Sequence, residues 1–284
     1  MVRGFRLVNE KGQSYSLMDI ENYCLLTDPS GLGYSYATEY EQLSNMFVEN
    51  LRKFEQGQIT GTVNCLKYDN FKDLVDFIEK AESLRIAYKV PFDKGEKEYL
   101  KDVNIKSLSK SQIQTTGVIS ETIVFDCLSL WYEETIAIYD MTEQDEEIRW
   151  DFKWDSKFTA YDIRSFDYIN KGHIDASVEI TIDGEVINPK IQLYIEGQLF
   201  QEISITDTIE EYEKLLYSSR EGDFYIKKEL VDGTYENMFN LSYIDFENDN
   251  VLRIPPNKDC TIRLTADEDI AKATITIFVY YISV

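Results

Sequence analysis

The residue types that carry most enzymatic chemistry are scarce in this sequence. The single histidine, His173, follows a glycine and has no cysteine near it in the sequence. A zinc site needs several His or Cys ligands, and a Ser-His-Asp or Cys-His relay would have to pass through this one residue. No Gly-x-Ser-x-Gly motif accompanies it. We therefore expect His173 to be a structural turn or loop residue, and we predict that the protein is not an enzyme.

Acidic residues are abundant, but no arrangement of them indicates a site. Glycoside hydrolysis needs two carboxylates at a defined separation, which a sequence alone does not supply. Asp245-Phe-Glu-Asn-Asp-Asn250 resembles the start of a calcium loop. It has Asn250 where such a loop needs glycine and Pro256 where it needs a bidentate glutamate. We expect an acidic loop and no bound metal.

Two further motifs could bind a ligand. Gly31-Leu-Gly33 lies between strand signals, and because no helix follows it, it lacks the context of a dinucleotide-binding loop. We therefore predict no cofactor. Trp150 and Trp154 alternate with charged residues and could form a platform on which a sugar stacks. The other interpretation, which we favour, is an aromatic strand packed in a core or an interface.

The composition indicates a folded, acidic, β-rich protein. Hydrophobic residues make up 43% of the 284 residues, which is enough for packed cores, and aromatic residues reach 13%. Tyr and Phe favour pleated, half-buried surfaces. The 29 basic and 52 acidic residues give a net charge of -23. This charge disfavours binding to nucleic acid and to anionic membrane surfaces.

The cysteines and the chain ends give three more expectations. Cys24, Cys65, Cys127 and Cys260 are far apart and form no Cys-x-x-Cys pair, so we predict buried free thiols in a reducing compartment and no disulfide. The first six residues lack the apolar stretch of a signal peptide. Residues 275–284 are too few and too rich in Thr and Tyr to cross a bilayer as a helix.

The elements that must position any site fall into two units. Residues 1–132 show strand signals at 5–8, 23–26, 59–66, 84–90, 98–108 and 117–126, and 33–54 has the pattern of a long hairpin. One helix is predicted at 69–82, with Asp69 or Asn70 as its N-cap. An extended run, 122–132, closes on Trp131-Tyr132.

Residues 133–284 form the second predicted unit, after the acidic connection at 142–147. Alternating apolar residues at 178–182 and 191–195 flank Asp183-Gly184, which predicts a hairpin. Asp232-Gly233 predicts another hairpin, and the last strand places Ile275, Ile277, Val279 and Tyr281 on one side. Many short strands indicate an antiparallel β-sandwich. The predicted class is therefore mainly β with one helix.

The order of these elements resembles the distal tail proteins of siphophages that infect Gram-positive bacteria. Short strands at 5–26, a hairpin at 33–54, a helix at 69–82 and a closing strand at 117–132 match the ring-forming domain of that family. The second unit is similar to the family's galectin-like sandwich. Three segments carry this similarity, which are Asn170-Lys-Gly-His-Ile-Asp-Ala176, the hairpin segment Asp183-Gly-Glu-Val-Ile-Asn-Pro-Lys-Ile191, and the Pro-rich turn Ile254-Pro-Pro-Asn-Lys-Asp259.

The resemblance implies a hexameric ring that joins the tail tube to the tip of the virion tail. Its implied partners are other copies of the chain, the tail tube protein, a hub protein similar to tail-associated lysins, and receptor-binding components. It also implies synthesis in the cytoplasm of the host. The family implies neither specific nucleic-acid binding nor membrane binding. The runner-up interpretation is a module that binds carbohydrate of the host cell wall, for which Trp150 and Trp154 are the candidate residues.

A ring requires an interface that repeats until the rotation closes. A projecting hairpin can add strands to the sheet edge of a neighbouring copy without special side chains. We therefore predict that residues 33–54 make the ring contact, through Tyr34, Tyr36, Phe47 and Phe54. An acidic protein also suits a ring through which DNA passes, because it does not grip the phosphates.

Overall fold

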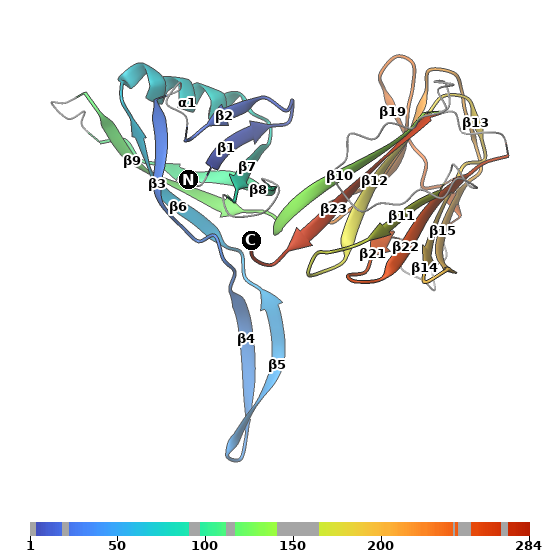
Figure 1. Ribbon diagram of the computed structural model, residues 1–284, viewed down its shortest axis with the longest axis horizontal. Helices are drawn as coiled ribbons and strands as arrows, with labels where there is room; N and C mark the ends of the chain where they lie inside the picture. Colours follow the sequence, from blue (N-terminus) through green and yellow to red (C-terminus); the bar gives the residue numbers. More distant parts are fainter. Residues whose placement is uncertain are drawn as a thin grey trace. The chain divides into compact units, whose positions relative to one another are not determined.

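The computed structural model describes residues 4–18, 23–90, 97–111, 117–140, 165–240, 242–243, 251–267 and 272–284. The chain divides into two compact units, which are Met1–Glu133 together with Tyr281–Val284, and Glu134–Tyr280. Antiparallel strands make up both units, and the described residues contain one helix, which lies in the first unit (Figure 1). The predicted mainly β class with one helix is confirmed.

The first unit is built around β8, which pairs with different strands along its length. The first half of β8 pairs with β7 and the second half with β9, with a register shift between Ile105 and Ser107. The strand orders are therefore β2-β1-β7-β8 and β3-β6-β9-β8. The elements are β1 (Gly4–Asn9), β2 (Ser14–Ser16), β3 (Cys24–Ser30), β4 (Tyr36–Leu43), β5 (Met46–Phe54), β6 (Gln58–Cys65), α1 (Tyr68–Lys80), β7 (Leu84–Lys89), β8 (Glu98–Leu108), β9 (Ile119–Cys127) and β10 (Trp131–Asp140).

Helix α1 packs its apolar face against the core of this unit. Phe71 and Leu74 are buried, and Phe77 contacts the ring of Tyr15 in β2. The predicted helix is confirmed, but the predicted N-cap is wrong. The helix begins one residue earlier, the capping position is Lys67, and no side chain caps the helix there. Asp69 instead lies in the first turn, where its charge favours the helix dipole.

Trp131 and Tyr132 begin a strand, whereas the sequence predicted that they end one. Strand β9 stops at Cys127, and the chain turns where the backbone N–H of Asp102 donates to Ser129 Oγ at 2.8 Å. Both aromatic residues are fully buried. The Tyr132 hydroxyl donates to Asp102 Oδ1 at 2.8 Å, which satisfies its polar end inside the core.

The second unit consists of two larger antiparallel sheets and one short strand pair. One sheet has the order β19-β18-β17-β12-β23-β10, with β21 beside β12, and the other has the order β11-β22-β14-β15-β20. Its strands are β11 (Ser165–Ile169), β12 (Ala176–Asp183), β13 (Val186–Ile187), β14 (Lys190–Ile195), β15 (Gln198–Ile205), β16 (Thr208–Ile209), β17 (Lys214–Arg220), β18 (Asp223–Glu229), β19 (Tyr235–Asn237), β20 (Ser242–Tyr243), β21 (Arg253–Ile254), β22 (Asp259–Thr265) and β23 (Lys272–Tyr281).

One of the two predicted hairpins in this unit is wrong. Strands β12 and β14 flank Asp183-Gly184 but lie in different sheets. The segment between them, which includes β13, instead carries the chain from one sheet to the other, and β13 pairs with β16. Asp232-Gly233 does join two paired strands, β18 and β19, and Gly233 has a φ of 81°. A tight turn is a local event, whereas the sheet that the next strand enters depends on burial.

Asn170 ties together two of the segments that carried the family resemblance. It is fully buried, and its Nδ2 donates to the carbonyl oxygens of Ile174 at 2.9 Å and Ile254 at 2.8 Å. Its Oδ1 accepts the N–H of Gly172 at 2.8 Å. Asn257 has a φ of 59°, so it holds the left-handed conformation that Asn tolerates. These segments therefore have a structural role.

Candidate functional site: the arm of the first unit

Within the part of the chain that the structure describes, strands β4 and β5 pair only with each other, and they extend away from the other strands of the first unit (Figure 1). We call residues 34–54 the arm. Ser44 and Asn45 form the turn between the strands, and Ser44 has a φ of 56°, as the first central residue of a tight hairpin turn requires. Every residue of β5 is exposed. The predicted hairpin is confirmed, and it contributes little to the core of its own unit.

Several contacts fix the root of the arm to the unit. The Trp131 indole donates from Nε1 to the carbonyl oxygen of Leu32 at 2.9 Å. Gly31 has a φ of +80°, and a Cβ there would lie 1.8 Å from the carbonyl oxygen of Gln58. Ser35 and Glu55 are joined by a backbone hydrogen bond of 3.0 Å and a side-chain hydrogen bond of 2.9 Å. The root therefore has a defined geometry although the arm is exposed.

A buried lysine supports the tryptophan that holds this root. Lys101 is only 4% exposed, and its Nζ lies 4.7 Å from the centre of the Trp131 ring. Burial lowers the pKa of Lys101, and Cys127 acts in the opposite direction. Burial also raises the pKa of the Cys127 thiol. A cation over the ring face is attracted to it, so Lys101 helps to fix the orientation of Trp131.

Three of the four predicted contact residues lie together at the base of the arm. The rings of Tyr36 and Phe54 stack at 4.8 Å, and the ring of Tyr34 meets the Tyr36 ring edge-on at 5.3 Å. The Arg52 guanidinium lies 3.9 Å above the Tyr36 ring. The fourth residue, Phe47, lies near the tip and is 69% exposed. The predicted set is therefore divided between the two ends of the arm.

A β-bulge collects exposed apolar side chains on one face of the arm. The register shifts between Glu39 and Tyr40, so that Leu51 pairs with Glu39 whereas Glu49 pairs with Tyr40. Paired residues share a face and successive residues alternate. The shift therefore brings together four apolar residues, which we call the stripe and which are Leu43 (53% exposed), Met46 (69%), Val48 (41%) and Leu51 (42%).

The stripe was not predicted from the sequence, because the strict alternation of side chains along a regular strand would place Val48 and Leu51 on opposite faces. Phe47 pairs with Gln42 and lies on the face opposite the stripe. The only available signal was the density of apolar residues at 43–51 on both sides of a turn. The shift in register that unites the four residues could not be located from that density.

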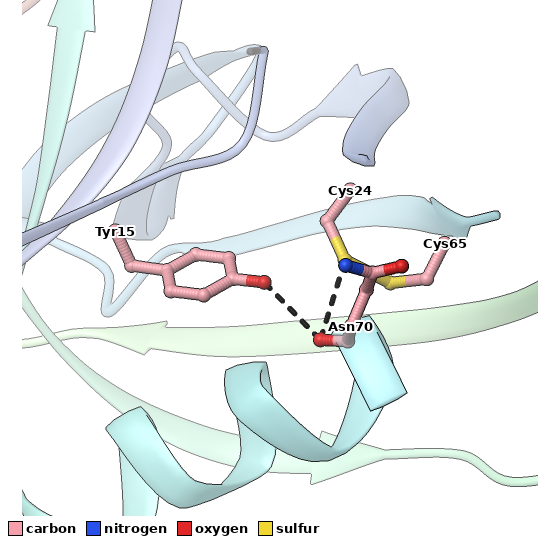
Figure 2. The surroundings of a disulfide bond; sticks show 4 residues. All are labelled: Tyr15, Cys24, Cys65 and Asn70. Atoms are coloured by element: carbon pink, nitrogen blue, oxygen red, sulfur yellow. Dashed lines mark hydrogen bonds between the residues drawn. A yellow bond between two sulfur atoms is a disulfide. The ribbon is translucent and has the colours of Figure 1, made fainter. Parts of the chain in front are cut away.

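The prediction of four free thiols is wrong for two of the cysteines. Cys24 and Cys65 form a disulfide, and Figure 2 shows it beside Asn70 at the start of α1. The two residues lie directly opposite each other in the β3–β6 ladder. They are distant in sequence but adjacent in the sheet, which the spacing of the cysteines could not reveal. Cys127 and Cys260 are free and buried, as predicted, and burial raises the pKa of Cys260 to about 11.

The other sequence candidates do not assemble into a site. His173 lies in the loop before β12, where its backbone N–H donates to the carbonyl oxygen of Tyr280 at 2.9 Å. Trp150, Trp154 and the acidic stretch at 245–250 lie outside the described residues. Among the residues that the structure does describe, no group of three or more His, Cys, Asp or Glu side chains is placed to bind a metal ion. Within the same residues, no helix is long and apolar enough to span a membrane.

Comparisons with known proteins cover the first unit in one case and nearly the whole chain in the others. Residues 4–128 match the family model of the distal tail protein, N-terminal domain. The chain is similar to a chain in the structure of the phage p2 baseplate in its activated conformation with strontium, with 18% identity, full coverage of both chains and a TM-score of 0.69. The p2 baseplate with calcium gives a TM-score of 0.67, also at 18% identity over the whole of both chains.

A third structure extends the similarity of fold to another phage. SPP1 Dit (gp 19.1), described as a paradigm of the hub adsorption apparatus in phages that infect Gram-positive bacteria, aligns over 96% of this chain and 98% of its own. The identity is 10% and the TM-score is 0.56. No curated protein matched the sequence. Residues 4–128 thus match the N-terminal domain of distal tail proteins, as the sequence predicted, and the similarity along the rest of the chain is one of fold.

Proposed function

We propose that this protein is a non-enzymatic structural component of the phage tail tip, where six copies form a closed ring through their arms. The proposal is based on the structure of the arm. It has defined geometry at its root, and among the described strands its two strands pair only with each other. It exposes four apolar side chains on one face. Monomeric proteins rarely expose such a contiguous apolar surface unless it binds something.

The free energy gained by burying apolar side chains exceeds that of exposed ion pairs, so the stripe is the main source of association free energy. Burying a Leu, Val or Met side chain contributes roughly 1.5–3 kcal/mol. Because the four residues are only 41–69% exposed in the free chain, burying the rest of them supplies about 3–6 kcal/mol before the entropic cost of association. An exposed ion pair contributes about 0–1 kcal/mol. In a chain with a net charge of -23, apolar contact and strand pairing must therefore overcome charge repulsion between the copies.

The ring would join the tail tube on one side to the hub protein of the tip on the other, and receptor-binding components would attach at its periphery. The acidic composition supports a conduit for DNA, because a surface poor in Lys and Arg does not retain phosphates. A lumen lined by basic residues in an assembled ring would contradict this part of the proposal.

The first test removes the arm and measures mass in solution by light scattering. Residues 33–54 are replaced by an Asn-Gly turn, which the closeness of β3 to β6 at the Ser30–Thr60 pair allows. We expect the full chain to form a closed oligomer and the shortened chain to be a folded monomer. Circular dichroism checks that the shortened chain is folded. A closed ring without the arm would refute the role of the arm.

A further inference from the structure

The disulfide lies at the opposite end of the β3–β6 ladder from the arm. The chain runs from Cys24 along β3 into the arm and returns along β6 to Cys65. The ladder between the two ends pairs Cys24 with Cys65 and reaches Ser30 and Thr60 next to the arm. The disulfide therefore closes a covalent loop of the chain that contains the whole arm. A force that pulls on the arm along β3 or β6 is transmitted no further along the chain than this bond.

Strand β3 needs such support because it is weakly held. Its one strand partner in the described sheet is β6, beside a single backbone hydrogen bond from the N–H of Leu26 to the carbonyl oxygen of Leu17 at 2.7 Å, and its register shifts between Thr27 and Ser30. Asp28 has a φ of 50°, and Pro29 has no backbone N–H to donate. The regular ladder thus covers only the first four residues of β3. An irregular strand with one partner separates easily when it is pulled.

The surroundings of the two sulfur atoms suit both the bonded and the reduced state. Cys24 and Cys65 face each other in register, so the bond forms or opens without moving the backbone. The carbonyl oxygen of Asn70 lies 3.6 Å from Cys24 Sγ and also accepts the Tyr15 hydroxyl at 3.2 Å (Figure 2). In the reduced protein this oxygen is an acceptor for the Cys24 S–H, whereas in the disulfide the sulfur only touches it.

We infer that Cys24 and Cys65 are a redox-controlled staple at the end of the β3–β6 ladder that lies away from the arm. They are thiols in the newly made chain and a disulfide once dioxygen outside the host cell has oxidised the assembled particle. The two thiols give up two protons and two electrons as their sulfurs bond to each other, and dioxygen accepts these protons and electrons to become hydrogen peroxide. Closing the bond locks β3 onto β6. The timing of this step rests on the proposed role in the virion.

Burial makes the staple slow to form and slow to open. Both cysteines have no exposed surface and lie in the apolar core of the first unit. Thiol–disulfide exchange requires a thiolate that can reach the sulfur. Neither sulfur of the pair is exposed to an external thiolate in the folded chain. The ring thus assembles from reduced chains and becomes resistant to reductants afterwards.

The experiment compares the full-length protein in its two redox states. Protein is purified under nitrogen, and its thiols are counted by alkylation in denaturant before and after exposure to air. We expect four thiols before oxidation and two after it. Hydrogen exchange at the amides of β3 should slow at least tenfold on oxidation. A constant thiol count, or equal exchange in both states, would overturn the inference.

Two double variants complete the test. Cys24→Ala/Cys65→Ala should fold and should lose the effect of oxidation on β3, whereas Cys127→Ala/Cys260→Ala should keep it in full. If the second variant also loses the effect, the staple is not the cause. The mass of the reduced protein in solution tests the ring separately. A ring that shows no redox effect would refute only the staple, and a redox-sensitive chain that forms no ring would refute only the proposed assembly.

Discussion

Gly31 is the residue on which the direction of the arm depends most directly. Its φ of +80° is a conformation that residues with a side chain rarely adopt, and a Cβ there would overlap the carbonyl oxygen of Gln58. Gly33 is the matched control, because a Cβ there meets nothing within 4 Å. The two glycines look equivalent in the sequence, where they are separated by a single leucine.

We predict that Gly31→Ala destabilises the first unit by at least about 1–3 kcal/mol, since the strained backbone alone costs this much. Gly33→Ala should change the free energy of unfolding by less than about 0.5 kcal/mol. Urea denaturation of the two variants measures both values. Equal stability of the two variants would show that the root of the arm is not fixed in the way described.

Glu121 gives the first unit a dependence on pH. It is 3% exposed. Burial raises the pKa of Glu121, but the hydrogen bonds from Ser111 and Ser109 together lower it by more than burial raises it. The pKa of Glu121 therefore lies below its usual value. A lowered pKa in the folded state stabilises the protein above the pKa of the unfolded chain, and this stabilisation is lost as the pH falls through the folded value.

We therefore expect the stability of the wild-type first unit to fall as the pH drops below about 4.3, and we expect Glu121→Gln to reduce that fall. Thermal unfolding measured between neutral and acidic pH tests this. The exposed glutamate Glu79 in α1 provides the control, because Glu79→Gln leaves the Glu121 hydrogen bonds in place. The same acid sensitivity in the Glu121→Gln protein would contradict the explanation.

At the scale of the secondary-structure elements, the two faces of the arm can be tested separately, because two adjacent residues lie on opposite faces. Val48 belongs to the stripe, and Phe47 lies on the opposite face. Both residues are exposed, so a charge at either position should leave the isolated chain stable to within about 0.5 kcal/mol. A matched pair of lysine substitutions can therefore report which face makes the contact.

We predict that Val48→Lys weakens association at least tenfold, or about 1.4 kcal/mol, because it places a charge among buried apolar groups. Phe47→Lys should weaken association less. Sedimentation at several protein concentrations measures both effects. The reverse order would move the contact to the face of Phe47, and unchanged assembly in both variants would exclude the tip of the arm from the interface.

At the scale of the whole molecule, the last residues of the chain stabilise the first unit, to which Tyr281–Val284 belong. The Tyr281 ring meets the Tyr99 ring edge-on at 5.3 Å, and its hydroxyl donates to Glu133 Oε2 at 2.7 Å. Val284 packs against the core of the same unit. From the sequence we expected all of 133–284 to lie in the second unit.

We predict that deleting residues 281–284 destabilises the first unit by about 2–4 kcal/mol, from the lost aromatic contact and the lost hydrogen bond to a carboxylate. Hydrogen exchange should accelerate in β8 but not in β14 or β15 of the second unit. Tyr281→Phe keeps the ring and should produce a smaller effect. Equal acceleration in both units would mean that the four residues do not act on the first unit alone.

The sequence by itself determined the fold class, the position of the helix, the existence of the arm and the similarity of residues 4–128 to distal tail proteins. These properties depend on local periodicity and on the order of elements, which a sequence records directly. The apolar residues of α1 recur at helical spacing, and the alternation in β23 shows one buried face.

Only the tertiary structure decided the features that depend on pairing between distant segments. The Cys24–Cys65 bond exists because β3 and β6 are antiparallel neighbours in one register. The stripe exists because a bulge shifts the register of β5 by one residue. Strand β14 leaves the sheet of β12 although a turn signal separates them. Register and sheet membership arise from packing over the whole unit, so no window of the sequence contains them.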